Sequence, residues 1–172
     1  HWIQQQQNNN FDEGGSWAAS GQINNDFLAQ LLDDNYFKLT PPKSTGTEYF
    51  NAAWLTKKLS AFPLLAAEDV QASLTVFTAI TVSDAVKQYA NDADEIIICG
   101  GGVHNDFLLQ QLTKNLPHIE IHSSAKYGLD PDYIEATAFA WLAKQTIEHQ
   151  YGNLPEVTGA KRGVILGGIY QA

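Results

Sequence analysis

Residues 96–105 read IIICGGGVHN, a continuous apolar run that leads directly into three consecutive glycines. The run Ile96–Cys99 shows no polar alternation, which predicts a strand buried on both faces, as in a parallel sheet. We therefore expect Cys99 to be a small buried hydrophobe. After the glycines, leucines recur at helical spacing at positions 108, 109, 112 and 116. This spacing predicts a helix, so a strand, a glycine turn and a helix follow one another.

The same pattern follows once more along the chain. Residues 119–122 (IEIH) predict a second strand, and a helix is expected from 131 to about 149. Asp130 suits the cap of this helix and Pro131 its first position. Two strands that alternate with two helices imply a right-handed parallel crossover and an α/β fold.

The first 90 residues predict helices and loops rather than strands. Asn24 or Asn25 can cap a helix that carries Phe27, Leu28, Leu31 and Leu32 at helical spacing. The other expected segments are a solvated helix end or loop at 4–10, a loop at 11–21, a loop at 41–46, a helix from 47 to about 59, and one long helix at 66–90 that is bent or broken around the β-branched run 78–82. The tail, 152–172, is rich in glycine and has a short apolar piece at 164–166.

Composition limits the class of protein. The chain has 172 residues, 44% of them hydrophobic and 17% charged, which predicts one ordered domain. Ten Lys and Arg against nineteen Asp and Glu give a net charge of −9, which argues against nucleic acid and anionic membrane as partners. No apolar run approaches the roughly 20 residues of a membrane span. The single cysteine excludes an intramolecular disulfide and suits a reducing cytoplasm. The absence of Met and the apolar start His1-Trp2-Ile3 lead us to expect that the chain is cut from a longer one.

The glycine turn is the strongest candidate for a ligand site. Glycines at 100, 101 and 102 let a ligand approach the backbone closely, and the next helix offers free N–H groups. Asn105 can cap that helix or bond the ligand. No Gly-Lys-Ser/Thr follows, so the turn is not a P-loop. Gly100, Gly102 and Glu120 half-match a dinucleotide fingerprint, but Asn105 stands where its third glycine belongs. A tight turn without a ligand is the alternative, and three glycines exceed what such a turn needs.

Glu135 is the second candidate. It shares a helical face with Ala138, Phe139 and Leu142, and a carboxylate on an apolar face near a helix start is useful in a cleft. The alternative is an acid that complements the helix dipole, and the pattern leaves both open. Residues 43–46 (KSTG) could touch phosphate or sugar, although an ordinary surface turn fits them better. The five histidines show no metal-site spacing.

Five motifs in order carry a family resemblance. They are GGSWAASG at 14–21, PPKSTG at 41–46 followed by EYFN at 48–51, CGGGxxN at 99–105, DxxEAxAFAWLA at 132–143 and GNLPxVTGA at 152–160. With these motifs the chain resembles the C-terminal half of the anhydro-N-acetylmuramic acid kinases, bacterial enzymes of the sugar-kinase/actin/Hsp70-like superfamily. The resemblance covers nearly all 172 residues.

The resemblance implies a ribonuclease-H-like domain, one of two that face a cleft in which ATP binds. It implies an ATP-dependent reaction in peptidoglycan recycling that opens 1,6-anhydro-N-acetylmuramic acid with water and gives N-acetylmuramic acid 6-phosphate. Gly100, Gly101, Gly102 and Asn105 would then lie against the nucleoside, and Glu135 would help hold the water or the sugar.

The resemblance also implies what is missing. The family's general-base aspartate belongs to a D-x-G-P-G-N motif that is absent from these 172 residues. We therefore expect residues 1–172 to be the C-terminal nucleotide-binding domain, without the N-terminal domain, with most Mg²⁺ ligands outside it and no activity alone. The expected partners are ATP, the sugar, the N-terminal half and, in the intact enzyme, a possible second copy. Two other functions stay open: a dinucleotide-binding domain of an oxidoreductase and a non-catalytic interaction domain.

Overall fold

The computed structural model describes residues 1–170. A two-stranded parallel sheet lies between a helical body, formed mainly by the residues before it, and a long helix with a tail, formed by the residues after it. Strand β1 (Glu95–Ile98) pairs with β2 (Glu120–Ser123), with Glu95 opposite Glu120 and Ile98 opposite Ser123. Helix α7 (Asp106–Asn115) connects the two strands. The predicted strand–helix–strand unit is confirmed, and mixed helix and parallel strand agree with the α/β class.

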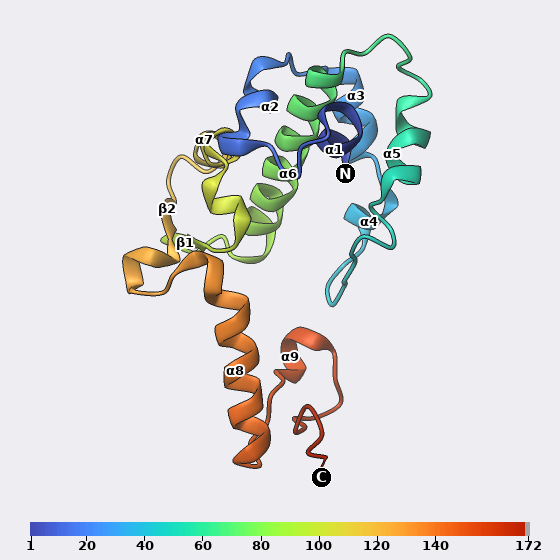
Figure 1. Cartoon of the computed structure of the whole chain (residues 1–172). Helices are drawn as coiled ribbons and strands as arrows, with labels where there is room; N and C mark the ends of the chain where they lie inside the picture. Colours follow the sequence, from blue (N-terminus) through green and yellow to red (C-terminus); the bar gives the residue numbers. More distant parts are fainter. Residues whose placement is uncertain (171–172) are drawn as a thin grey trace.

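Before the sheet lies a helical body, in which α6 (Ala67–Tyr89) packs against α2 (Ser16–Ser20), α3 (Asn25–Leu32) and α7 (Figure 1). Its core centres on Phe27, Leu31 and Val70, none of them more than 1% exposed. The smaller elements of the body are α1 (Trp2–Gln7), a 3₁₀ turn η1 (Glu13–Gly15), α4 (Asn35–Lys38) and α5 (Ala52–Leu59).

After the sheet, the chain leaves the body. Two 3₁₀ turns, η3 (Ser124–Tyr127) and η4 (Pro131–Tyr133), lead into α8 (Ile134–Ile147). Figure 1 shows α8 projecting away from the helical body, with α9 (Pro155–Thr158) and the tail beside it. Asp130 accepts a hydrogen bond from the N–H of Asp132 at 3.0 Å, which confirms its role as a cap. The predicted helix at 131–149 therefore begins as a 3₁₀ turn and becomes α-helical at Ile134.

The prediction that the first strand is buried on both faces is wrong. Ile97 is 50% exposed, and Cys99 is exposed rather than buried. Ile96 and Ile98 are half-buried, so exposure alternates along β1. The physical reason is that a parallel strand is buried on both faces only where helices cover both, and among residues 1–170 no helix covers the face of the sheet that carries Ile97.

The predicted loop at 11–21 is wrong from Glu13 to Ser20, where the chain forms η1 and α2. The Asp12 carboxylate accepts hydrogen bonds from the N–H groups of Trp17 and Ala18, both at 2.9 Å, and so satisfies the start of α2. Ala18 is fully buried where α2 packs on α6. The two glycines and two serines of this segment are typical of a loop, so the sequence did not predict the helix. Asp12, which accepts the bonds at its start, stands five residues before Trp17, farther away than an ordinary N-cap residue.

Three other helices match their predictions with small corrections. Asn24 caps α3 through a bond from the N–H of Phe27 at 2.9 Å. Helix α5 begins at Ala52, five residues later than predicted, because the Asn51 side chain caps it. Helix α6 continues without a break through 78–82. There the Thr78 hydroxyl bonds the carbonyl of Leu74 at 3.0 Å, within the same helix.

Candidate functional site

The glycine turn leaves open space where side chains would stand. A Cβ atom built on Gly100 or on Gly101 meets no other atom within 4 Å, and one on Gly102 would only touch Leu108 at 3.8 Å. Gly100 has a φ of 70°, which favours glycine, whereas Gly101 does not lie in the left-handed region. Neither packing nor backbone conformation therefore requires glycine at position 101. A ligand that approaches the backbone would require it.

A groove of about 790 Å³ opens beside this turn. Its size falls in the range of small-molecule sites, roughly 300–1,000 Å³. Two loops and one helix line it, and their residues are Phe11, Asp12, Glu13, Gly14, Gln71, Gly101, Gly102, His104 and Asn105. The groove thus brings together the first and third family motifs, which lie about 90 positions apart in the sequence.

The two loops interlock at Gly15 and Asn105. Asn105 accepts a bond from the N–H of Leu108 at 2.9 Å and so caps α7, as the sequence suggested. The site where Gly15 would carry a Cβ is occupied by the Asn105 side chain, with Oδ1 only 2.1 Å away. Because the cap uses only the side-chain oxygen of Asn105, its amide nitrogen can still donate to a ligand.

The glycine turn is also fastened to η4, the 3₁₀ turn that leads into α8. The N–H of Gly100 donates to the carbonyl of Pro131 at 2.8 Å. His104, in the 3₁₀ turn η2 (Gly101–His104), places Nε2 2.9 and 3.1 Å from the two carboxylate oxygens of Asp132. Both side chains are more than half exposed, so this pair contributes little energy. Its consequence is geometric, since it ties the third motif to the fourth.

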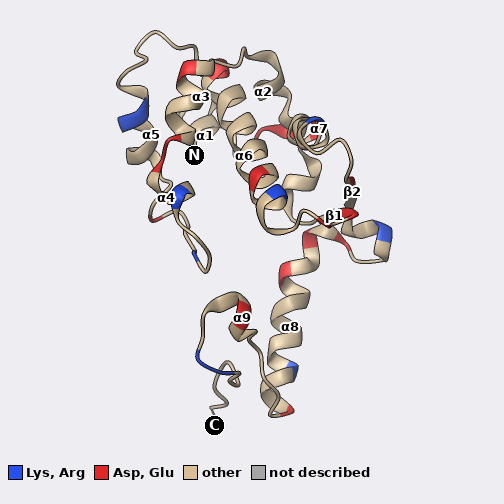
Figure 2. Cartoon of the chain, turned by 180° about the vertical axis from the view of Figure 1, so that it is seen from behind, with Lys and Arg blue, Asp and Glu red and all other residues tan. Residues whose placement is uncertain are grey.

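The walls of the groove are acidic. Asp12 and Glu13 line it, and Asp106 lies 4.0 Å from the Cβ position of Gly14. Figure 2 shows red Asp and Glu positions and a few blue Lys and Arg positions scattered over the body, without a basic stripe among the described residues. Carboxylates repel phosphate oxygens. The groove therefore suits the uncharged nucleoside part of a nucleotide better than its phosphates.

Glu120, the acid of the dinucleotide alternative, lies at the wrong end of the sheet. It pairs with Glu95 at the start of the strands, three residues before Ile98 and the glycine turn. At about 3.3 Å per residue this is roughly 10 Å along the strand. Its carboxylate instead bonds Nε2 of His122 at 2.8 Å, and this bond lowers the pKa of Glu120. The geometry therefore does not place Glu120 beside the turn, where the dinucleotide alternative needs it.

Glu135 is not part of the groove. It lies in the first turn of α8 and is exposed. The apolar face that was expected to carry it into a cleft is itself uncovered, with Phe139 65% exposed. The structure brings Glu135 near the glycine turn only through the link between η4 and η2.

The Lys43 loop behaves as a surface turn. Lys43 Nζ donates to the carbonyl of Tyr36 at 3.1 Å and lies 4.8 Å from the centre of the Tyr36 ring. The loop also meets the fifth motif, because a Cβ on Gly159 would lie 2.9 Å from Pro42 Cγ. Lys43 is thus held by its own neighbourhood rather than directed at the groove.

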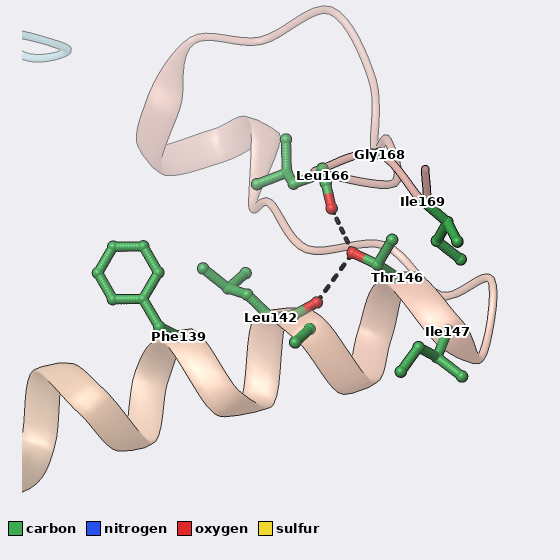
Figure 3. Close-up of a pocket in the computed structure, with 9 residues that line it drawn as sticks. Phe139, Leu142, Thr146, Ile147, Leu166, Gly168 and Ile169 are labelled. Carbon is green, nitrogen blue, oxygen red and sulfur yellow. Dashed lines mark hydrogen bonds between the residues drawn. The ribbon is translucent and has the colours of Figure 1, made fainter. Parts of the chain in front are cut away.

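A second hollow, of about 600 Å³, lies between α8 and the tail (Figure 3). Its lining is almost wholly apolar and includes Phe139, Leu142, Leu166 and Ile169. The Thr146 hydroxyl faces it, but its single hydrogen is taken up by the carbonyls of Leu142 and Leu166, which both lie within hydrogen-bond distance. With so few free polar groups, this hollow cannot orient a nucleotide or a sugar.

Neither a metal cluster nor a membrane helix is found in the described part of the chain. No group of three or more His, Cys, Asp or Glu side chains is close enough there to hold a metal ion. None of its helices is long and apolar enough to cross a membrane.

Phe11, Asp12 and Gln71 are among the groove residues that sequence reasoning did not single out. Phe11 could have been noticed as an aromatic residue at the edge of a glycine- and serine-rich loop, and Asp12 as a possible cap for the motif at 14–21. Gln71 gives no signal, because a glutamine in the middle of a helix is typical of a solvated surface.

Comparison with known proteins identifies relatives along the whole chain. The family model described as anhydro-N-acetylmuramic acid kinase matches residues 1–172. Proteins of that name from Pasteurella multocida and Xylella fastidiosa are each 48% identical to it, over 98% and 99% of this chain and 45% of their own length. The one from Variovorax paradoxus is 48% identical over all of this chain and 46% of its own length. The chain thus spans about half the length of the curated relatives it matches.

Proposed function

Because this chain belongs to the anhydro-N-acetylmuramic acid kinase family, we propose that it is the nucleoside-binding half of an ATP-dependent sugar kinase. The intact enzyme would convert 1,6-anhydro-N-acetylmuramic acid and water to N-acetylmuramic acid 6-phosphate, in peptidoglycan recycling. The finer fold that goes with this function is the ribonuclease-H-like domain of the sugar-kinase and actin group. The two parallel strands, with α7 between them, would be a part of its sheet.

One observation carries the proposal: the open space over Gly101 in the wall of the groove. Glycine at this position serves neither packing nor backbone conformation. The neighbouring Asn105 offers an amide N–H, and the groove has the volume of a nucleoside site. Gly100, Gly101, Gly102 and Asn105 would hold the nucleoside by close backbone contact and a directed hydrogen bond.

The acidic walls of the groove indicate which part of ATP each half of the enzyme would bind. Asp12 and Glu13 make this groove a poor place for the triphosphate, so the phosphates would extend away from it, toward the other half. Phosphoryl transfer depends on positioning and on charge stabilisation. Mg²⁺, when bound with ATP, would neutralise phosphate charge. We propose that its ligands and the general-base aspartate lie mostly outside these 172 residues.

We propose that α8 and the tail contact the other half of the enzyme. Helix α8 carries apolar side chains around its whole circumference, a pattern typical of a buried helix, yet none of its residues is fully buried by the described part of the chain, and the tail covers Leu142 and Thr146 only in part. Eight large apolar side chains of this region are between 51% and 71% exposed, namely Tyr133, Phe139, Trp141, Ile147, Tyr151, Leu154, Val157 and Ile169. A surface of this kind marks a protein contact.

Glu135 keeps its proposed supporting role at the sugar end of the cleft. It lies in the first turn of α8, the helix that carries this exposed surface. Its carboxylate would then act where the two halves meet, on the attacking water or on the sugar, and not on the nucleoside.

Titration by NMR tests the nucleotide site. We expect ATP to shift the amide signals of residues near Gly101, and we expect the chain not to bind NAD analogues more tightly than ATP. One wall of a cleft gives weak binding, on the order of millimolar. A clear preference for NAD analogues would support an oxidoreductase domain. No shift with any nucleotide would support a non-catalytic interaction domain.

A further inference from the structure

Phe11 is a large apolar side chain that the fold leaves uncovered in the wall of the groove. It is 70% exposed and lines the groove together with Gly101 and Gly102. None of the aromatic pairs among residues 1–170 includes Phe11, whereas six other aromatic residues form one cluster, namely Tyr36, Phe37, Tyr49, Phe50, Trp54 and Phe77. A ring exposed beside a turn without side chains is suited to stack on a flat aromatic ligand. Proteins commonly hold a base by stacking it on an aromatic side chain.

Gln71 contributes a polar group of fixed orientation to the same groove. Its Nε2 donates to Oδ2 of Asp12 at 3.3 Å. Oδ2 also accepts from the N–H of Ala18, and a carboxylate can only accept. The amide nitrogen must therefore be the atom that faces Asp12, which leaves Oε1 of Gln71 as an acceptor. Gln71 is half-buried in α6, so its position is set by a rigid element.

From these two residues we infer that the groove recognises the base of the nucleotide. Phe11 stacks on the face of the base, and Gln71 Oε1 accepts a hydrogen bond from an exocyclic amino group. Adenine carries an amino group at position 6, whereas hypoxanthine and guanine carry a carbonyl oxygen there, which would face the Gln71 oxygen and repel it. The groove is therefore selective for a 6-aminopurine. This inference rests on the proposed function, because it names the residues that choose the nucleotide at that site.

Competing titrations with ATP and ITP test the inference, since the two differ at position 6 of the base. We expect the wild-type chain to bind ATP about tenfold more tightly than ITP, the size of one directed hydrogen bond. Gln71→Met should remove this preference by weakening ATP. Gln71→Lys can still pair with Asp12 but offers only donors, so it should shift the preference toward ITP.

Phe11 is tested by its effect on both nucleotides. Phe11→Ala should weaken ATP and ITP alike by roughly tenfold. Phe11→Tyr, which keeps the ring, should bind as the wild type does. Phe139→Ala is the matched control, because Phe139 is similarly exposed at 65% and lies outside the groove. Thermal unfolding of each variant checks that it is folded.

The outcomes separate the two proposals. Equal binding of ATP and ITP by the wild type, or normal binding by folded Phe11→Ala, would overturn the inference and leave the nucleotide site in place. Absence of binding of either nucleotide to the wild type would overturn both.

Discussion

The Asn105 side chain occupies the space in which Gly15 would carry a Cβ atom. That Cβ position lies 2.1 Å from Asn105 Oδ1 and 2.9 Å from Asn105 Cγ. Gly15 also has a φ of 69°, a conformation that other residues rarely adopt. Asn105 is held in place because it caps α7. The loop that precedes α2 and the turn that precedes α7 are thereby locked together, and they are the two loops that line the groove.

This contact predicts that Gly15→Ala destabilises the chain by about 2–3 kcal/mol, from strain at positive φ and displacement of the cap. Gly101→Ala is the matched control. It adds a methyl group where no atom lies within 4 Å, so it should cost little stability or none. Urea unfolding measures both variants. Equal stability of the two would show that the loops are not locked at Gly15.

The ionisation of the buried Asp34 carboxyl makes the stability of the fold depend on pH. It is 6% exposed, and burial, the largest influence, would by itself raise the pKa of its carboxyl. The influences that outweigh burial and lower the pKa below 3.8 are hydrogen bonds from Trp54 Nε1 at 2.9 Å, from Tyr49 OH at 2.7 Å and from the N–H of Tyr36 at 3.0 Å, together with Lys58. A lowered pKa in the folded state stabilises the fold above the unfolded value, and this stabilisation is lost as pH falls through the folded value.

Asp34→Asn should therefore lower the unfolding free energy at pH 7 by about 1.5–3 kcal/mol, the range for hydrogen bonds to a charged group. Below about pH 4 the difference between variant and wild type should shrink, because the unfolded wild-type chain then binds a proton at Asp34 that the folded chain, with its lowered pKa, binds only at lower pH. Unfolding by urea between pH 7 and pH 2 measures both. A difference that stays constant over this range would mean that the charge of Asp34 does not stabilise the fold.

Local patterns predicted the elements that depend on local interactions. The leucine spacing after Asn105 predicted α7, the Asn24 cap predicted α3, and the short apolar runs predicted both strands in the correct order. The sequence did not predict which surfaces are covered. Ile97 and Cys99 have the composition of a buried strand, but burial is decided by layers that residues 1–170 do not supply.

The glycine turn was predicted as a site, but the residues opposite it were not. Phe11 and Gln71 reach the groove because α2 and α7 both pack on α6, which is a long-range arrangement that no local spacing encodes. Glu120 shows the converse. Its distance in sequence fitted a ribose-binding acid, yet the strand register places it at the opposite end of the sheet.

We predict that Gly101→Val weakens nucleotide binding and leaves the fold intact. The two methyl groups would occupy the open space over the turn, where we propose that the nucleoside lies. In the intact enzyme the KM for ATP should rise by ~10-fold or more, while thermal stability changes little. A folded variant with normal ATP binding would exclude the turn from the nucleoside site.

Glu135→Ala predicts a loss of turnover in the intact enzyme, with kcat lowered by ~10²-fold, the usual scale for a positioned acid or base. Thermal stability should change little, since Glu135 is exposed and its effect on the helix dipole is worth under about 1 kcal/mol. Steady-state kinetics and a melting curve separate the two effects. Full activity with lowered stability would assign Glu135 to the helix dipole instead.

The central claim, that this chain is one half of a two-part kinase, is tested most directly by reconstitution. The chain, the remaining half of the enzyme, and the two together are each given ATP, Mg²⁺ and 1,6-anhydro-N-acetylmuramic acid, and N-acetylmuramic acid 6-phosphate is measured by mass spectrometry. We predict no product from either half alone and measurable product from both, because the exposed surface of α8 and the tail lets the halves dock. Abundant product from this chain alone would contradict the account, because it would require a catalytic base within these 172 residues.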